Sequence, residues 1–256
     1  MRIQYASDLH LEFVTNRNYL RLFPLEVTGD ILVLAGDIQY LKVGYAEDPF
    51  WDWASANYRQ VIVALGNHEF YHGHDINTVA PSTVIEIREN VHAYYNAAVT
   101  IDDVEFIVST LWAHIEPTDF FVVYHSVADF SQILCDGKYL TPDRFNEEHD
   151  RCLAFVKKAV AESTARHKVV VTHHVPSTLL TAPEFRNSRI NGAFTVELGD
   201  FIADSGIDCW IYGHSHRNID EMIGSTRCVS NQLGYVRSSE HRSFDRGKMI
   251  EILSVG

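Results

Sequence analysis

Short apolar runs, separated by polar stretches, predict a series of buried strands. The runs are four to six residues long and rich in β-branched residues, which favour strands. They cover residues 3–6, 31–35, 61–65, 104–109, 168–172, 209–212, 226–230 and 249–253.

Helical patterns lie between several of these runs. The clearest covers residues 142–166, where Thr141 can cap the helix and Pro142 suits its first position. Residues 82–96 and 195–204 are further predicted helices. Strands that alternate with helices predict an α/β fold with a partly parallel sheet, whose ligands bind outside the carboxyl ends of the strands. Because no repeat or linker interrupts the chain, we expect a single domain over residues 1–256.

Two segments do not fit this alternation. Residues 113–142 are rich in aromatic side chains, and we expect this segment either to pack conventionally or to form a cap or wall beside the site. Residues 175–193 carry Arg186, Arg189 and Asn191, which are candidates for binding a substrate phosphate. The alternative for the arginines is a solvated surface.

Net charge and cysteine spacing limit which binding partners and which cellular compartment the chain is expected to have. The chain has 256 residues, of which 46% are apolar, and a formal net charge of −13, which disfavours nucleic acids and anionic membranes. The four cysteines have no paired spacing, so reduced thiols are expected. A strand that starts at once leaves no room for a signal peptide, and no apolar stretch is long enough to span a membrane. We therefore expect a cytoplasmic protein.

Five of the predicted strands are followed by side chains that bind metals. The five segments are Asp8-Leu9-His10, Gly36-Asp37, Gly66-Asn67-His68-Glu69, His173-His174 and Gly213-His214-Ser215-His216. Carboxylate, amide and imidazole groups together suit hard or borderline divalent metals. The candidate ligands are Asp8, His10, Asp37, Asn67, His173, His214 and His216, with His174 as the alternative to His173.

The spacing suggests how two ions could be held. Asp8 and His10 are two residues apart and would share one side of an extended backbone, while Asp37 could bridge two ions through its two oxygens. His214 and His216 would bind one ion, or different ions if they flank a two-metal centre. Two ions about 3.5–4 Å apart can share a hydroxide and clamp a phosphoryl group during displacement.

Such a reaction needs a proton source for the leaving group. His68 follows Asn67 directly, so it can reach the site without being a ligand. We expect Glu69 to orient the His68 ring, as carboxylates behind a catalytic ring often do.

The order of these motifs resembles the calcineurin-like metallophosphoesterase superfamily, and the match runs from Asp8 to His216. The resemblance implies a four-layer α-β-β-α sandwich of two mixed sheets flanked by helices. It implies one metal on Asp8, His10, Asp37 and His216, and a second on Asp37, Asn67, His173 and His214. It also implies two divalent transition-metal ions (manganese first; iron, zinc or nickel as alternatives) and a leaving-group or transition-state role for His68.

Positions at which the chain departs from the family pattern indicate which branch of the superfamily it resembles. Protein phosphatases of the superfamily carry G-D-x-V-D-R-G, whereas this chain continues Gly36-Asp37-Ile38-Gln39-Tyr40-Leu41 and lacks the arginine. The phrases Thr110-Leu111-Trp112 and Asn191-Gly192-Ala193-Phe194 are similar to those of a bacterial subgroup of small phosphoesterases.

We therefore expect a phosphoesterase that hydrolyses a small phosphate mono- or diester by attack of a metal-bridging hydroxide. The alternatives are a non-catalytic scaffold with this fold, a nuclease, which the acidic charge disfavours, and a mononuclear zinc hydrolase.

Overall fold

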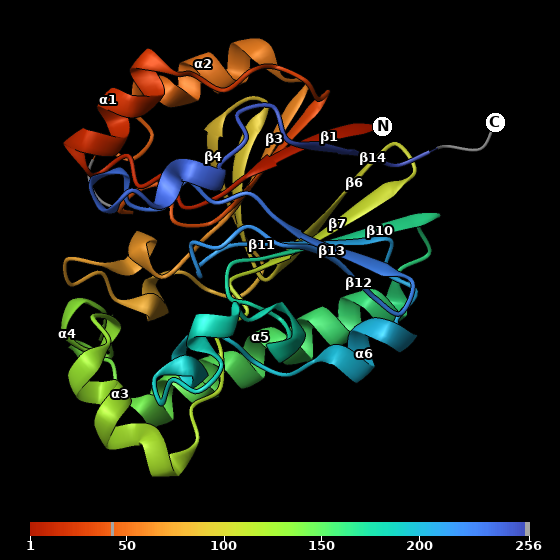
Figure 1. Cartoon of the computed structure of the whole chain (residues 1–256). Coiled ribbons are helices and arrows are strands. Elements are labelled where there is room, and N and C mark those ends of the chain that lie inside the picture. The colour runs from red at the N-terminus through yellow and green to blue at the C-terminus, as the bar shows by residue number, and fades with distance from the viewer. Residues whose placement is uncertain (42–43, 254–256) are drawn as a thin grey trace.

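A computed structural model of the chain describes residues 1–41 and 44–253. Two six-stranded sheets face each other, and helices cover the outer surface of each sheet (Figure 1). This arrangement confirms the predicted four-layer α-β-β-α sandwich.

The first sheet has the strand order β14-β1-β2-β3-β5-β4. Its strands are β1 (Arg2–Ala6), β2 (Ile31–Ala35), β3 (Gln60–Ala64), β4 (Thr83–Arg88), β5 (Val91–Tyr95) and β14 (Met249–Glu251). The four inner strands pair in parallel, and β14 and β4 pair antiparallel at the edges, so the sheet is mixed.

The second sheet repeats this plan in the order β12-β13-β11-β10-β7-β6. Its strands are β6 (Ala97–Ile101), β7 (Val104–Ser109), β10 (His167–Thr172), β11 (Cys209–Tyr212), β12 (Asp220–Ile223) and β13 (Thr226–Ser230). The four inner strands are again parallel, with antiparallel strands at both edges. A separate small hairpin joins β8 (Leu134–Cys135) to β9 (Lys138–Tyr139).

Four helices form the outer layers. The first sheet is covered by α1 (Val14–Leu22) and α2 (Pro49–Asn57), and the second by α5 (Pro142–Glu162) and α6 (Gly199–Asp204) (Figure 1). Two shorter helices, α3 (Phe120–Ser126) and α4 (Asp129–Gln132), belong to the aromatic segment 113–142. Short 3₁₀ helices cover His68–Phe70, Ile76–Thr78, Pro117–Asp119, Thr178–Leu180, Pro183–Phe185, Asn191–Ala193, Val236–Ser238 and Glu240–Ser243.

The long helix α5 begins as the sequence predicts. The Thr141 hydroxyl accepts a hydrogen bond from the backbone N–H of Arg144 at 3.4 Å, and Pro142 occupies the first turn. The helix buries Phe145, Cys152 and other residues of one face against the second sheet and the loops beside it. The prediction for residues 195–204 is only partly right, because α6 begins at Gly199.

The predicted helix over residues 82–96 is wrong. These residues form the antiparallel pair β4 and β5, which turns around Asn90. The first strand alternates half-buried and exposed positions and contains three β-branched residues in a row, at Thr83, Val84 and Ile85. Both features favour a strand at a sheet edge over a helix.

The core explains why the strands are almost continuously apolar. Along β2, Ile31, Val33 and Ala35 pack between the two sheets, whereas Leu32 and Leu34 point into the core under α1 and α2. Both faces of an inner strand are therefore buried. Within residues 1–41 and 44–253, no helix combines the length and apolar character that a membrane span requires.

Candidate metal centre

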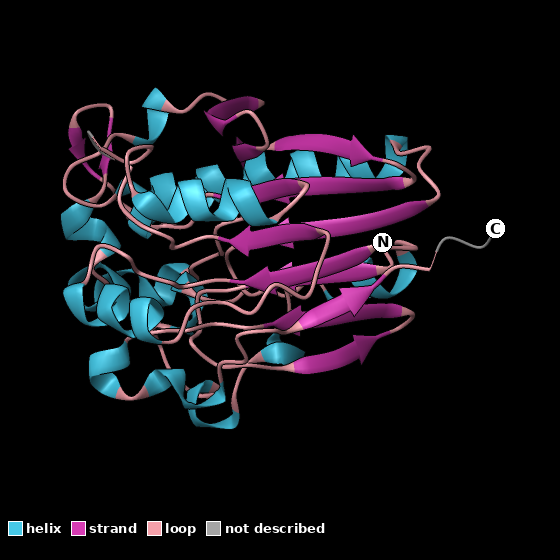
Figure 2. Cartoon of the chain, turned by 90° about the horizontal axis from the view of Figure 1, so that it is seen from above, coloured by secondary structure: helices cyan, strands magenta, loops and turns pink. Residues whose placement is uncertain are grey.

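The side chains of the five motifs lie at the same end of the two sheets, where five inner strands finish. Asp8 follows β1, Asp37 follows β2, Asn67 follows β3, His173 follows β10 and His214 follows β11. Figure 2 shows the strands running side by side, with most of the loops and short helices gathered at one end. Parallel strands bring their carboxyl ends together, so residues far apart in the sequence meet here.

Several of the motif residues adopt an uncommon backbone conformation. The φ angles are 54° at Asp8, 47° at His10, 56° at Asp37, 73° at His214 and 52° at His216. These left-handed conformations cost free energy in residues other than glycine and concentrate at functional sites. The expectation that Asp8 and His10 share one side of an extended backbone is therefore wrong, although both side chains still reach one cluster.

Two glycines allow the motif segments to approach closely. A Cβ atom on Gly66 would lie 2.2 Å from Oδ1 of Asp37, and one on Gly36 would lie 2.4 Å from Nδ1 of His173. Gly36 also has a φ of 87°. Any side chain at either position would displace a candidate ligand. This explains why the two motifs have glycine at these positions.

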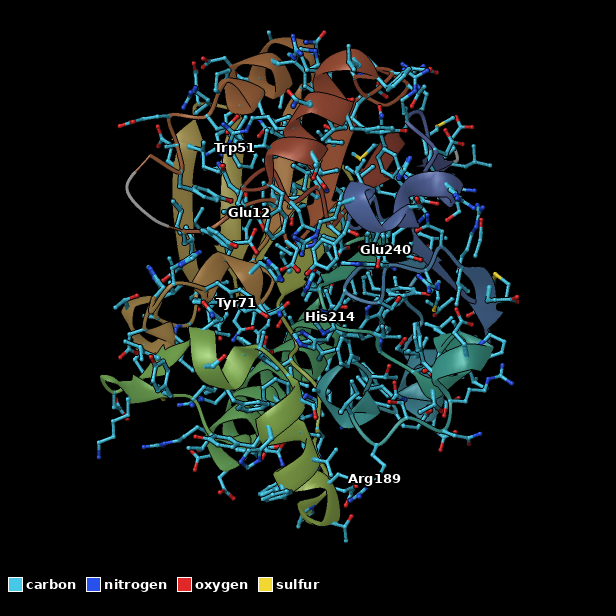
Figure 3. The ribbon with its side chains drawn as sticks, turned by 60° about the vertical axis from the view of Figure 1, so that its left-hand side comes forward. Glu12, Trp51, Tyr71, Arg189, His214 and Glu240 are labelled. Carbon is cyan, nitrogen blue, oxygen red and sulfur yellow. The ribbon has the colours of Figure 1, made fainter. Side chains whose placement is uncertain are left out.

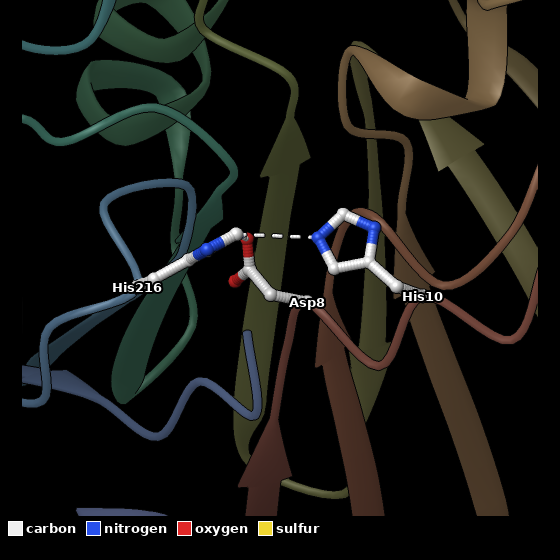
Figure 4. Close-up of side chains that lie close together, drawn as sticks. All are labelled: Asp8, His10 and His216. Atoms are coloured by element: carbon white, nitrogen blue, oxygen red, sulfur yellow. Dashed lines mark hydrogen bonds and ion pairs between the residues drawn. The ribbon is translucent and has the colours of Figure 1, made fainter. Parts of the chain in front are cut away.

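The first group of candidate ligands contains Asp8, His10 and His216 (Figure 4). Nε2 of His10 lies 3.2 Å from Nε2 of His216, and the latter atom lies 3.3 Å from Oδ1 of Asp8. The Asp8 and His10 side chains are fully buried, and that of His216 is 12% exposed.

The second group contains Asp37, His173 and His214, and Asn67 joins it. Nε2 of His173 lies 3.2 Å from Oδ1 of Asp37, 3.1 Å from Nδ1 of His214 and 3.0 Å from Oδ1 of Asn67. The other carboxylate oxygen of Asp37, Oδ2, lies 3.8 Å from Nε2 of His10 in the first group. Asp37 therefore faces both groups, and His214 and His216 lie in different ones.

The four imidazoles are oriented in the way that metal ligands require. In each ring the outer nitrogen has an oxygen partner: Glu12 for His10, Glu240 for His216, the Ala35 carbonyl for His173 and the Ala193 carbonyl for His214. The inner nitrogens lie 3.2 Å apart in the pair His10 and His216, and 3.1 Å apart in the pair His173 and His214. Outer partners of this kind fix the tautomer so that the inner nitrogen can bind a metal. The donor set thus fits two divalent ions, with Asp37 between them.

His68 lies beside His10 of the first group, with 4.5 Å between the two ring centroids, but it is held differently. Its Nδ1 is 3.0 Å from Oε1 of Glu12, and its Nε2 is 3.2 Å from the Tyr235 hydroxyl and 4.0 Å from Oδ2 of Asp37. The same Glu12 oxygen also lies 3.0 Å from Nδ1 of His10. One buried carboxylate therefore orients both a candidate metal ligand and the candidate proton donor.

The expected role of Glu69 is wrong. Its two oxygens accept hydrogen bonds from the backbone N–H groups of Asp37 at 3.0 Å, Ile38 at 2.8 Å and Gly66 at 2.7 Å. Glu69 therefore ties two ligand loops together, and Glu12 orients the His68 ring in its place.

Several residues that orient the site were not predicted from the sequence, among them Glu12, Asp129 and Glu240. Asp129, which is fully buried, accepts hydrogen bonds from the Asn67 amide at 2.8 Å and from the Tyr71 hydroxyl at 2.7 Å, and so directs Oδ1 of Asn67 toward His173. Glu240 lies 2.6 Å from Nδ1 of His216. Figure 3 labels Glu12, Tyr71 and Glu240 around the region where loops of both sheets meet.

In the metal-free site, burial and neighbouring charges shift the pKa values of several of these side chains. Burial by itself lowers the pKa of His216, but Asp8 and Glu240 outweigh it and raise that pKa to about 10. Asp37 and Asp8 likewise overcome burial and raise the pKa of His173 to about 9. Burial would raise the pKa of Asp37, yet the neighbouring histidines hold it well below its usual value. The metal-free site therefore holds carboxylates against protonated imidazoles, and metal ions can replace those protons.

A cavity of about 280 Å³ opens onto the two groups. Asp37, Asn67, His68, His214 and His216 line it, and Ser126, Val127 and Ala128 of the aromatic segment form part of its wall. Arg217, which no motif had indicated, lines it as well.

The three residues predicted to contact substrate, Arg186, Arg189 and Asn191, do not line this cavity. Arg189 instead donates hydrogen bonds to Asp119 at 2.9 Å and to the Thr118 carbonyl, and Figure 3 shows it apart from the other labelled residues. Asn191 lines an adjoining cavity.

His174, the alternative to His173, has a packing position. Its Nδ1 lies 3.2 Å from the Thr110 carbonyl, and its ring packs against those of Trp112 and His214. In the described part of the chain it belongs to none of the groups of His, Asp and Glu side chains that could hold a metal ion.

Comparisons with known proteins agree with this geometry. The sequence model of the calcineurin-like phosphoesterase family matches residues 1–218. The chain therefore belongs to this family.

Individual relatives are more distant. The uncharacterized protein L509 of Acanthamoeba polyphaga mimivirus is 28% identical over 98% of this chain and 97% of its own length. The crystal structure of phosphopantetheinyl hydrolase from Mycobacterium tuberculosis superposes with a TM-score of 0.68 and 16% identity, covering 94% of this chain and 92% of that one. At this identity the superposition shows a shared fold.

Proposed function

We propose that the protein is a metal-dependent phosphoesterase with two divalent ions, which hydrolyses a small phosphate ester. One observation carries the proposal: the two oxygens of Asp37 face separate groups of oriented donors, Asp8, His10 and His216 on one side and Asn67, His173 and His214 on the other. Two ions held there would lower the pKa of a shared water and stabilise the charge that develops on the phosphoryl oxygens.

The residues of the chain then have distinct tasks. Asp8, Asp37, Asn67 and the four histidines hold the ions, and the cavity beside them admits the phosphate. His68, which lines the cavity while Glu12 holds its Nδ1, donates a hydrogen bond or a proton to the leaving oxygen. Asp37 and Glu12 outweigh burial and raise the pKa of His68, which favours its protonated form in the metal-free site.

Arg217 supplies positive charge to the lining of the cavity. Its Nη1 donates to the His216 carbonyl at 2.9 Å, its Nε donates to Glu184 at 2.7 Å, and its side chain is 38% exposed. We propose that Nη2 of Arg217 contacts a phosphate oxygen, a role that the sequence had assigned to Arg186 and Arg189. A guanidinium here favours a dianionic monoester over a diester.

The same donor atoms indicate which metals could bind and how well a non-catalytic role fits. Mixed carboxylate, amide and imidazole ligands suit manganese, iron, zinc or nickel, and manganese is the first ion to test. A non-catalytic scaffold is the second candidate. A scaffold fits the structure less well, because the outer nitrogen of each of the four imidazoles has an oxygen partner. Packing alone would not require all four rings to turn their other nitrogen toward the same centre.

Hydrolysis of an aryl phosphate monoester and diester by the Mn²⁺-loaded protein tests the proposal. We expect turnover by the unchanged chain, a loss of at least about 100-fold for Asp37→Ala and for Asn67→Ala, and no loss for Arg189→Ala. If Asp37→Ala and Asn67→Ala kept the turnover of the unchanged chain, the centre would be wrongly assigned.

A further inference from the structure

A second cavity adjoins the one at the metal centre. Its volume is about 180 Å³. Its lining residues are Thr181, Ala182, Phe185, Ser188, Ile190, Asn191, Phe194, Thr195 and Ser215, and four of these (Phe185, Ile190, Phe194 and Ser215) also line the first cavity. Since roughly 10–15 Å³ suffices for one water molecule, the second cavity has room for a group of several non-hydrogen atoms.

The shared residues place this cavity one side chain away from the candidate ligands. The Phe194 ring stacks on the His214 ring, with 4.7 Å between their centroids and 23° between their planes. Ser215 lies between His214 and His216 in the chain. A phosphate ester bound at the metal centre can therefore extend its organic group past Phe194 and Ser215.

The two cavities differ in charge. Asp37, Asp129, Glu240 and Arg217 are among the residues that line the first, whereas none of the nine residues that line the second is charged. A charged group entering the second cavity would lose its hydration without gaining an ionic partner, which is costly. An apolar group would instead gain free energy by leaving water.

One polar group in the second cavity is available to a ligand. The side-chain amide of Asn191 makes no hydrogen bond with any residue in the described part of the chain. It can therefore accept a hydrogen bond from, or donate one to, a hydroxyl or amide of a bound molecule.

We propose that the second cavity binds the organic group of the ester, and that the substrate is the phosphate ester of an uncharged, mainly apolar alcohol. The inference rests on the proposed function, because that function puts the phosphate at the metal centre. Esters whose organic part carries further phosphates or carboxylates do not fit, because this lining offers no cation.

A series of n-alkylphosphonates from methyl to hexyl tests the proposal by direct binding. The phosphonate head keeps the same charge along the series and its C–P bond is not a hydrolysable ester, so only the apolar length changes. We expect the dissociation constant from the Mn²⁺-loaded protein, measured by titration calorimetry, to fall roughly fourfold for each added methylene until the cavity is filled.

Substitutions then locate the alkyl chain. Ala182 lines the second cavity but not the first and is 6% exposed, so Ala182→Leu should fill the space and flatten the dependence on chain length. Leu179→Ala is the matched control, because Leu179 is 65% exposed on the same segment and should leave the dependence unchanged. If Ala182→Leu does not fold, Ile190→Asn should reduce the dependence by making the lining polar.

The outcomes separate this inference from the proposed function. A dissociation constant that stays flat or rises with chain length, or a dependence that survives both Ala182→Leu and Ile190→Asn, overturns the assignment of the cavity. Aryl phosphate hydrolysis is measured on the same samples. If the protein hydrolyses the aryl phosphate but the dissociation constant does not depend on chain length, the proposed function stands and the inference about the cavity is wrong. If the dissociation constant falls with chain length but no hydrolysis occurs, the cavity is correctly assigned and the proposed function is wrong.

Discussion

Replacing Glu12 with glutamine removes the charge that holds His10 and His68 together. Oε1 of Glu12 lies 3.0 Å from Nδ1 of each ring, and the Glu12 side chain is only 3% exposed. Glutamine keeps the size of the side chain and can still accept through its carbonyl oxygen. The change therefore removes the charge and leaves the shape.

The size of the effect follows from the two hydrogen bonds. A bond to a charged group contributes about 1.5–3 kcal/mol, against about 0.5–1.5 kcal/mol for a neutral one, so the loss over two bonds is about 2–3 kcal/mol. Part of this loss weakens the metal held by His10, and part weakens the orientation of His68. We expect kcat at saturating Mn²⁺ to fall 10- to 100-fold, in line with other carboxylates behind metal-ligating rings.

The assay measures kcat and KM for an aryl phosphate together with the Mn²⁺ affinity of the same sample. Glu26→Gln is the matched control, because Glu26 is an exposed residue that pairs with Arg246, and exposed ion pairs contribute little. Thermal unfolding of both variants checks that the fold persists. If Glu12→Gln retained the kcat and the metal affinity of the unchanged chain, the shared carboxylate would have no part in the site.

Three further predictions follow from the same geometry. In the metal-free protein the pKa of His173 is raised to about 9 and that of His216 to about 10, so Mn²⁺ binding at pH 7 should release about two protons per chain, and the apparent affinity for Mn²⁺ should rise with pH up to that range. Calorimetry in buffers of different ionisation enthalpy measures the proton release. Metal binding without proton release would contradict the prediction. Gly66→Ala should lower metal content to about one ion or fewer per chain, because a Cβ would lie 2.2 Å from Asp37 Oδ1. Gly137→Ala should keep both ions, because its Cβ meets no atom within 4 Å and the strain at its φ of 72° falls on the exposed turn between β8 and β9. Chelation should lower the midpoint of thermal unfolding, since ions bind only the folded arrangement, and an unchanged midpoint would argue against bound metal.

The inner strands could be predicted from the sequence because both of their faces are buried. All eight apolar runs form strands, with ends that differ by at most two residues. The edge strand β12 has no such run, since its Asp220, Glu221 and Met222 are exposed. The helix α1 was missed for a similar reason, because it buries only Asn16 and Leu20 and its N-terminus has no side-chain cap.

The candidate ligands could be found because each motif directly follows a buried strand, and the α/β plan brings those strand ends together. The residues that hydrogen-bond to the candidate ligands and orient them could not be found in this way. Asp129 lies 62 positions from Asn67, and Glu240 lies 24 positions from His216, so these contacts depend on how loops pack. Glu12 could have been suggested from the sequence, because it lies only two positions from His10.

Whether the chain holds two metal ions with Asp37 between them can be measured by counting the ions bound to the folded protein. The protein is loaded with Mn²⁺, passed through a desalting column and analysed for metal and protein in the same fractions. We expect about two ions per chain, and about one or fewer for Asp37→Ala, because this carboxylate faces both groups. A chain that retains no ion, or an Asp37→Ala variant that still binds two, would contradict this expectation.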